Sequence, residues 1–330
     1  MSTSISITKI SEASDAEWDM AWEASDRATY SQSRAWANLW IDQSNGLLKS
    51  STLKAEFNDG QTVVLPLATM SQYKGLAKSH MTPAGGGYGG WLSCNPLHER
   101  HKELLLSVIY RLGDVSWLTN PLDEFSLENT ANLGILDETY LLNLETGIDQ
   151  IVKSWTKGHR SATQQARNSN VQISEASSEN DWKSYFDVYQ DSLRRWGEKA
   201  TSNYPWSVFK NLHSLQDKSI KLWIAKHDDQ IVAGALCLYS KSHISYWHGA
   251  VLESAMPVRP VNLLMYSILE DACRSGFRWF DFGLSGGHDG VSSFKRSFGA
   301  LATPCRNIRI ESKWNTVLKK LVTVKERVLS

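Results

Sequence analysis

The stretch DFGLSGGHDGVSSFKRSFG, residues 281–299, combines a glycine-rich loop with one lysine between two phenylalanines. It begins at the end of a predicted strand, where open α/β sheets commonly place ligands. A lysine there could stabilise the negative charge that develops on a carbonyl oxygen during acyl transfer, an effect of about 3 to 4 kcal/mol. Lys295 is therefore our first candidate catalytic residue. The simpler alternative is a solvated lysine between core phenylalanines.

Asp281, at the strand end that precedes the loop, is the second candidate catalytic residue. A carboxylate in this position could orient an amine or accept its proton, provided that it lies within hydrogen-bond reach. The alternative is a structural role, in which Asp281 pairs with a nearby arginine and stabilises the loop.

Basic residues gather in two stretches of a chain whose formal net charge is zero. Residues 150–174 contain no carboxylate, and Arg160 and Arg167 lie seven residues apart there, on one face of a predicted helix. Residues 290–310, which include Lys295, repeat the pattern. Paired arginines suit a phosphate group, so we predict that both bind an anionic substrate. A solvated basic helix face is the alternative.

The segment HISYWHGA, residues 243–250, alternates as a strand does. Alternation predicts that Tyr246 and His248 share one face while Trp247 takes the other, so both are candidate substrate-binding residues. A packed histidine is the alternative reading of His248.

Several classes of protein are excluded or disfavoured. Zero net charge argues against a protein coated with positive charge for nucleic acid. The four cysteines are far apart, which predicts reduced thiols and no zinc site. We see neither a signal-peptide pattern nor an apolar run near the roughly 18 residues that cross a bilayer, and we expect a cytoplasmic protein without a metal.

A chain of 330 residues predicts two domains. The second half reads strand, strand, strand, helix, strand, and the first half can be read in the same order. The helices near 98–112 and 262–275 should cross over between parallel strands, whereas the NDG and DDQ turns require antiparallel hairpins. This predicts an α/β fold of two tandem GNAT-like domains, each a mixed, mostly antiparallel sheet flanked by helices. We place them at 1–147 and 148–312, with a helix at 313–330 that folds back onto the first.

The order of several segments resembles the FemABX aminoacyltransferases and their GNAT-superfamily relatives. They include SQSRAWANLW (31–40), TPAGGGYGG (82–90), WTKGHRSATQQARNSNVQI (155–173), DVYQDSLRRWG (187–197) and FKRSFG (294–299). The resemblance implies that Lys295, next to Phe294, belongs to the transfer site and that Arg195 ends a helix facing the acceptor. It also marks Trp36 and Tyr88, in the two N-terminal segments, as candidate substrate-binding residues.

The resemblance further implies transfer of an aminoacyl or acyl group onto an amine of a cell-envelope or polysaccharide precursor. The donor would be a co-substrate, either aminoacyl-tRNA or acyl-CoA, and no bound cofactor is expected. GNAT enzymes hold CoA pyrophosphate on a Q/R-x-x-G-x-G/A turn. The corresponding VRPVNLLM, residues 258–265, lacks both small residues, which favours a donor other than CoA. An acyl-CoA-dependent N-acyltransferase and an inactive binding module remain alternatives.

Overall fold

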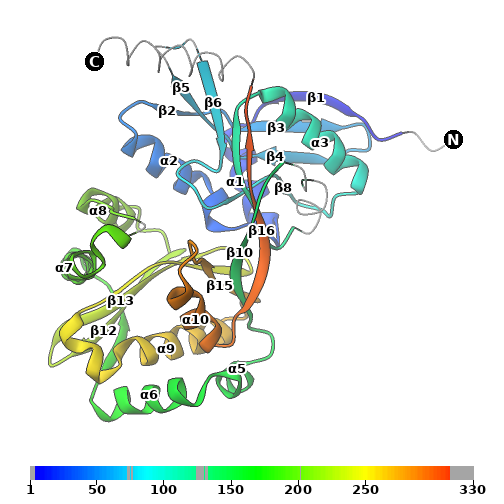
Figure 1. The fold of residues 1–330 in the computed structure, drawn as a ribbon. Helices are drawn as coiled ribbons and strands as arrows, with labels where there is room; N and C mark the ends of the chain where they lie inside the picture. The colour runs from blue at the N-terminus through cyan, green and yellow to red at the C-terminus, as the bar shows by residue number, and fades with distance from the viewer. Residues whose placement is uncertain are drawn as a thin grey trace. The chain divides into compact units, whose positions relative to one another are not determined.

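The computed structural model describes residues 4–72, 75, 77–123, 130, 133–200 and 202–312. The chain divides into two compact units, one comprising residues 1–137 and 304–330 and the other residues 138–303. Each unit is an α/β structure (Figure 1).

The second unit holds one sheet with helices on both of its faces. Its elements are the second half of β10 (Gly134–Asn143), α5 (Ile148–Ser154), α6 (Lys157–Asn168), β11 (Gln172–Glu175), α7 (Glu179–Trp196), α8 (Trp206–Ser214), β12 (Ile220–His227), β13 (Gln230–Tyr239), β14 (His243–Val251), α9 (Pro260–Arg274), β15 (Trp279–Leu284) and α10 (Asp289–Ser297). The strand order in this unit is β11-β12-β13-β14-β15-β10.

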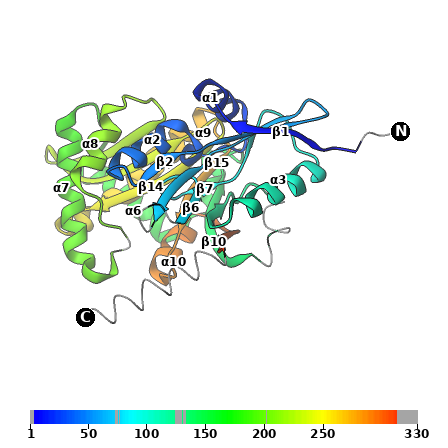
Figure 2. The same cartoon turned by 90° about the horizontal axis from the view of Figure 1, so that it is seen from above.

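Pairing in this sheet follows the predicted turns and crossover. The strands β12, β13 and β14 run antiparallel, joined by tight connections, whereas β14 and β15 are parallel and connected by α9. Helices α7 and α8 pack together over β13 and β14, and α9 packs with α6 on the other face (Figures 1 and 2). The largest buried cluster includes Leu264, Met265 and Ile268 of α9 against Phe280 of β15.

The first unit is built from two sheets. Its elements are β1 (Ile7–Glu12), α1 (Asp15–Ala24), α2 (Arg34–Gln43), β2 (Leu48–Ser50), β3 (Leu53–Phe57), β4 (Thr62–Leu65), β5 (Ala68–Gln72), β6 (Ala77–Thr82), β7 (Tyr88–Gly89), β8 (Leu92–Ser93), α3 (Glu99–Leu112), β9 (Val115–Thr119) and most of β16 (Leu301–Ile310). The strand orders are β1-β3-β4-β8 and β16-β9-β6-β5-β2. The strands β6 and β9 are parallel, and the chain between them passes through β7, β8 and α3.

The segment 61–70 is divided between the two sheets. β4 pairs with β3 and β8, whereas β5 pairs with β2 and β6. Pro66 lies between them, and a proline has no N–H for a ladder hydrogen bond. The proline therefore falls where the chain leaves one sheet for the next.

The boundaries of the units differ from the predicted 147/148 because the strands that follow β9 and β15 are exchanged. β10 follows β9 in the sequence, but it pairs with β15 in the second unit. β16 follows β15, but it pairs with β9 in the first unit. Residues 138–147 therefore belong to the second unit and 304–312 to the first. The helix predicted at 313–330 lies outside the described residues.

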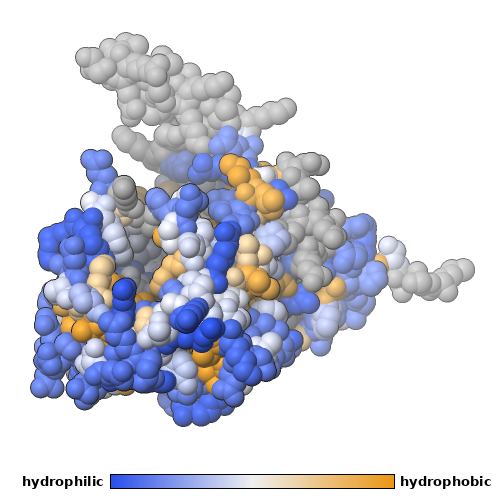
Figure 3. All heavy atoms as spheres, turned by 60° about the horizontal axis from the view of Figure 1, so that its bottom comes forward, coloured by the Kyte–Doolittle hydropathy of each residue, from blue (hydrophilic) through white to orange (hydrophobic). Residues whose placement is uncertain are grey.

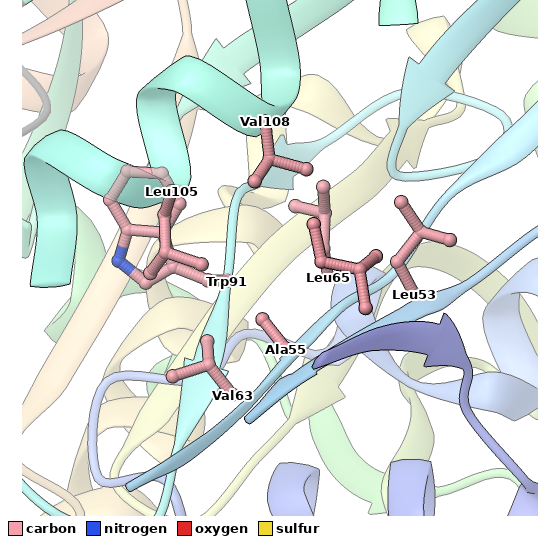
Figure 4. A pocket seen from close by; sticks show the side chains of 8 residues that line it. Leu53, Ala55, Val63, Leu65, Trp91, Leu105 and Val108 are labelled. Atoms are coloured by element: carbon pink, nitrogen blue, oxygen red, sulfur yellow. The ribbon is translucent and has the colours of Figure 1, made fainter. Parts of the chain in front are cut away.

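The core of the first unit contains a small apolar void. Leu53, Ala55, Val63 and Leu65 of β3 and β4 face Leu105 and Val108 of α3, with Trp91 beside them (Figure 4). The void measures about 10 Å³. A space of that size holds at most about one water molecule, so the feature is a packing gap and no ligand site.

Candidate active site

Lys295 is a buried side chain on α10. Only 4% of the residue is exposed. Its Nζ donates hydrogen bonds to the backbone oxygens of Gly283 (2.7 Å) and Leu284 (2.8 Å), at the end of β15. It also lies 5.6 Å from the centre of the Tyr140 ring, which offers it a cation–π contact. The structure thus places a lysine charge at the strand end where the sequence predicts it.

Burial changes the proton affinity of this lysine. Desolvation lowers the pKa of Lys295 to about 8, although the charge of Asp281 acts to raise it. Near neutral pH the side chain is then mostly an ammonium, yet a modest rise in pH removes the charge. An ammonium has three N–H donors, and the two backbone oxygens accept two of them.

Asp281 is more deeply buried than Lys295, with 1% of the residue exposed. Its Oδ1 accepts hydrogen bonds from Thr139 Oγ1 (2.6 Å) and from the backbone N–H of Gly283 (2.7 Å). Burial acts to raise the pKa of this carboxyl. The contact with His243 and the hydrogen bonds from Thr139 and Gly283 together outweigh burial, so the pKa lies below its usual value.

His243 completes this cluster, and sequence reasoning did not single it out. It is fully buried at the start of β14, and its Nε2 lies 3.5 Å from Asp281 Oδ2. The parallel register pairs Ser245 with Asp281, which brings this end of β14 next to the carboxylate. Only the strand register could have revealed the contact, because the two residues are 38 positions apart.

His159 of α6 links α10 to α9, and sequence reasoning did not single it out either. Its Nε2 lies 2.9 Å from Ser297 Oγ and its Nδ1 lies 2.8 Å from Asn262 Nδ2. Its ring contacts Phe294 and Phe298, with centroids 6.2 and 4.5 Å away. Burial and the charge of Arg259 lower the pKa of His159. Phe294, a predicted substrate-binding residue, is half-buried in this contact.

The two predicted phosphate-binding arginines both lie on α6. Arg160 donates from Nη1 to the backbone oxygens of Lys153 (3.1 Å) and Trp155, at the end of α5. The guanidinium of Arg167 stacks 4.5 Å from the centre of the Tyr266 ring. Both arginines are exposed. Binding of an anion by them stays a prediction.

Arg195 joins the end of α7 to the end of β14. Its Nη1 donates to the backbone oxygen of Val251 (3.3 Å) and lies 3.9 Å from Asp191 Oδ2. Its role toward an acceptor is untested.

Tyr246 and His248 do not share a face, contrary to the alternation predicted for β14. The register shifts by one residue there, so that Cys237 faces Tyr246 while Leu236 faces His248. This bulge turns His248 toward Tyr185 of α7, whose hydroxyl lies 2.6 Å from His248 Nδ1. Tyr246 packs instead against the rings of Phe280 and Phe282. Burial lowers the pKa of His248 to about 3 and raises that of Tyr246.

Trp36 and Tyr88 lie in the first unit, where the two N-terminal segments meet. Trp36 Nε1 donates to the backbone oxygen of Gly86 (3.2 Å), and Ser31 Oγ donates to that of Tyr88 (2.8 Å). Trp36 and Tyr88 are both buried, at 2% and 6% exposure. Their predicted contact with substrate stays a prediction.

Other kinds of site receive no support from the described part of the chain. There, no group of three or more His, Cys, Asp or Glu side chains has an arrangement that could hold a metal ion. Among the same residues, no helix combines the length and apolar character needed to span a membrane. On the face shown in Figure 3, hydrophilic side chains predominate and hydrophobic ones are scattered among them.

Comparison with known proteins gives a family match for the second unit and a fold match for the chain. Residues 154–296 match the family described as acetyltransferase (GNAT) domain. The solved structure of FemX superposes with a TM-score of 0.71 at 13% identity, over 91% of this chain and 97% of that one. No curated protein matches the chain.

Two further structures share the fold. The first is the C-terminal domain of a protein described as a lysylphosphatidylglycerol synthetase from Agrobacterium fabrum, with a TM-score of 0.57, 12% identity and coverage of 93% of this chain and 96% of that one. The second is L-PGS from Bacillus licheniformis, with a TM-score of 0.51, 11% identity and coverage of 84% and 91%.

Residues 154–296 are thus similar to the acetyltransferase (GNAT) domain family, within a chain that has the fold of FemX. The predicted fold class and the resemblance to the FemABX and GNAT proteins are confirmed. The prediction of an acyltransferase enzyme is also supported.

Proposed function

We propose that this chain forms amide bonds, transferring an aminoacyl group to an amine of a cell-envelope or polysaccharide precursor. The observation that carries the proposal is Lys295, a buried ammonium with two N–H groups bound to Gly283 and Leu284 and a third remaining to donate.

The positive charge of Lys295 acts in one step of amide formation. The acceptor amine attacks the ester carbonyl of the donor, and its C–N bond forms as negative charge moves onto the carbonyl oxygen. The ammonium of Lys295 stabilises this oxygen by hydrogen bonding. The ester C–O bond then breaks, the amine loses a proton and the departing hydroxyl gains one.

The start of α9 argues against CoA as the donor. A helix N-terminus binds pyrophosphate through unused backbone N–H groups. Here the first residue is Pro260, which has no N–H, and the N–H of Asn262 already bonds to Arg259 O (3.1 Å).

Helix α6 also contacts this end of α9. Gln165 Nε2 donates to Pro257 O (2.8 Å), and His159 bonds to the Asn262 side chain. An aminoacyl ester of tRNA therefore fits this unit better than an acyl thioester of CoA. Because aminoacyl-tRNA is a cytoplasmic donor, the proposal places the reaction in the cytoplasm.

The donor is tested by supplying both kinds to the purified protein. One reaction contains aminoacyl-tRNAs charged with labelled amino acids and a soluble fraction of cell-wall and polysaccharide precursors; the other contains labelled acetyl-CoA and the same fraction. We expect label in an alkali-stable amide from the first reaction only, and no heat of CoA binding in calorimetry. Acetyl transfer together with CoA binding would establish the acyl-CoA alternative, and precursor binding without any transfer would indicate an inactive binding module.

A further inference from the structure

Asp281 has two buried ionisable neighbours that come from different elements. The first is His243 of β14, whose Nε2 lies 3.5 Å from Asp281 Oδ2. The second is Lys295 of α10, which bonds to Gly283 as Asp281 does and whose pKa the Asp281 charge raises. Asp281 is 1% exposed, and its Oδ1 already accepts hydrogen bonds from Thr139 and Gly283, so the protein itself occupies this oxygen.

The Oδ1 atom of Asp281 shapes the turn that receives the lysine. It accepts the N–H of Gly283, two residues ahead, at 2.7 Å. Gly283 has a φ of +74°, a left-handed conformation that glycine adopts without strain. The backbone oxygens of Gly283 and Leu284 then face Lys295 Nζ. The carboxylate and the ammonium are therefore joined through this turn.

Two neighbouring strands hold the carboxylate in place. Thr139 of β10, which is fully buried, donates to Oδ1 at 2.6 Å. His243 of β14 faces Oδ2 and is itself fully buried. Among the described residues, neither His243 Nε2 nor Asp281 Oδ2 has a hydrogen-bond partner. The two atoms lie 3.5 Å from each other, which is a long polar contact and not a hydrogen bond.

Two further charged groups, Arg296 and Glu138, lie at Tyr140 of β10, the ring that Lys295 contacts. The guanidinium of Arg296 also stacks on that ring, at 5.3 Å. Glu138 bonds to the Tyr140 hydroxyl and lies 3.4 Å from Arg296 Nη2. Because Arg296 and Glu138 form an ion pair of opposite charges, Asp281 supplies the net negative charge that acts on Lys295.

We propose that Asp281 is a positioning residue, held by Thr139 and His243, which fixes the Gly283 turn and keeps the Lys295 side chain protonated. This role replaces direct proton transfer by Asp281. It rests on the proposed function of Lys295 for its catalytic meaning, but the contact itself can be measured without any substrate.

The first test follows the ionisation of Lys295 by NMR in protein with ¹³Cε-labelled lysine. The signal is assigned by its absence from Lys295→Met. Asp281→Asn keeps an oxygen that can accept from Thr139 and Gly283 but removes the negative charge. We expect the pKa of Lys295 to fall further in this variant, and the ratio of ammonium to amine falls about tenfold when the pKa falls by one. An unchanged pKa in folded Asp281→Asn would overturn the proposal.

A second pair of variants tests the positioning and does not depend on the folding of Asp281→Asn. Thr139→Val removes the hydroxyl, whereas Thr139→Ser keeps it. We expect the Lys295 signal to shift or broaden in Thr139→Val and to return to the wild-type position in Thr139→Ser. Identical spectra for all three proteins would contradict the proposal.

Transfer kinetics separate this inference from the proposed function. If Lys295 acts as an ammonium, the rate falls as pH rises through its pKa, and Asp281→Asn moves that fall to lower pH. We also expect Thr139→Val to reduce kcat by about tenfold to a hundredfold through misplacement of the ammonium, with KM unchanged. Full activity of Lys295→Ala would refute the catalytic role alone, whereas an inactive Lys295→Ala with unaltered Asp281 and Thr139 variants would refute the positioning role alone.

Discussion

Several polar side chains of this chain are buried, and each of them contacts a polar neighbour. Lys295, Asp281 and His243 are each at most 4% exposed, and each faces a polar neighbour. The same holds for His248, whose partner is the Tyr185 hydroxyl. Burial costs free energy unless such bonds form, so the partner of each group decides what its replacement does.

At the residue scale, we predict that His248→Phe lowers the free energy of unfolding by about 1 to 3 kcal/mol, because it leaves the buried Tyr185 hydroxyl without its acceptor. His248 is neutral at ordinary pH, since its pKa is about 3. The double variant Tyr185→Phe/His248→Phe removes both groups and should recover most of the loss. Urea unfolding measures both effects. A double variant as unstable as the single one would contradict this account, and a raised KM in a stable double variant would support the predicted substrate contact.

The glycines at the two ends of α10 differ in whether the structure has room for a side chain in their place. Gly299 follows the helix with a φ of +83°, and a Cβ there would lie 2.2 Å from Ser154 Oγ. Gly290 lies inside the helix, and a Cβ there would meet no atom within 4 Å. The first glycine is required by conformation and space, whereas the second is not.

At the element scale, we therefore predict opposite effects of one substitution. Gly299→Ala should lower the free energy of unfolding by about 1 to 2 kcal/mol through left-handed strain. Gly290→Ala should raise it by up to about 1 kcal/mol, because alanine favours a helix more than glycine does. Denaturant midpoints at unchanged slope check both variants. Equal denaturant midpoints for Gly299→Ala and Gly290→Ala would contradict this prediction and show that the turn after α10 tolerates a side chain.

The elements show where sequence patterns are informative. Ser14 and Ser178 cap the starts of α1 and α7, and both form capping boxes, a pattern that can be seen in a sequence. Alternation located β14, because side-chain period reflects burial, whereas β13 is buried along nearly its whole length and shows no alternation. The bulge at Trp247 escaped prediction because one extra residue leaves no compositional signal. His243 and His159 escaped for a similar reason, since their contacts depend on register and helix packing.

At the scale of the whole molecule, the exchange of β10 and β16 between the two units differs most from what the sequence predicts. Sequence order suggests that each half completes its own sheet, but long-range pairing gives each unit a strand from beyond the expected boundary. The second unit needs that strand, because Tyr140, Leu142 and Leu144 belong to its buried cluster.

This exchange predicts which fragment folds. Residues 138–303 keep the strand next to β15, whereas residues 148–303 lose it together with the buried Tyr140, Leu142 and Leu144. We expect cooperative thermal unfolding of the longer fragment and aggregation of the shorter one, because the shorter one exposes the apolar surface that these side chains cover. Equal stability of the two fragments, measured by circular dichroism, would argue against the assignment of β10.

The central claim is that the ammonium of Lys295 promotes transfer, and its most direct test compares transfer rates of Lys295→Ala and Lys218→Ala. Lys218 is an exposed lysine of the same unit and serves as the matched control. We expect the Lys295 variant to lose about a hundredfold or more in kcat, the scale of losing one donor to a developing oxyanion, while it remains folded. The Lys218 variant should keep the wild-type rate. A folded Lys295→Ala enzyme with the wild-type rate would contradict the account.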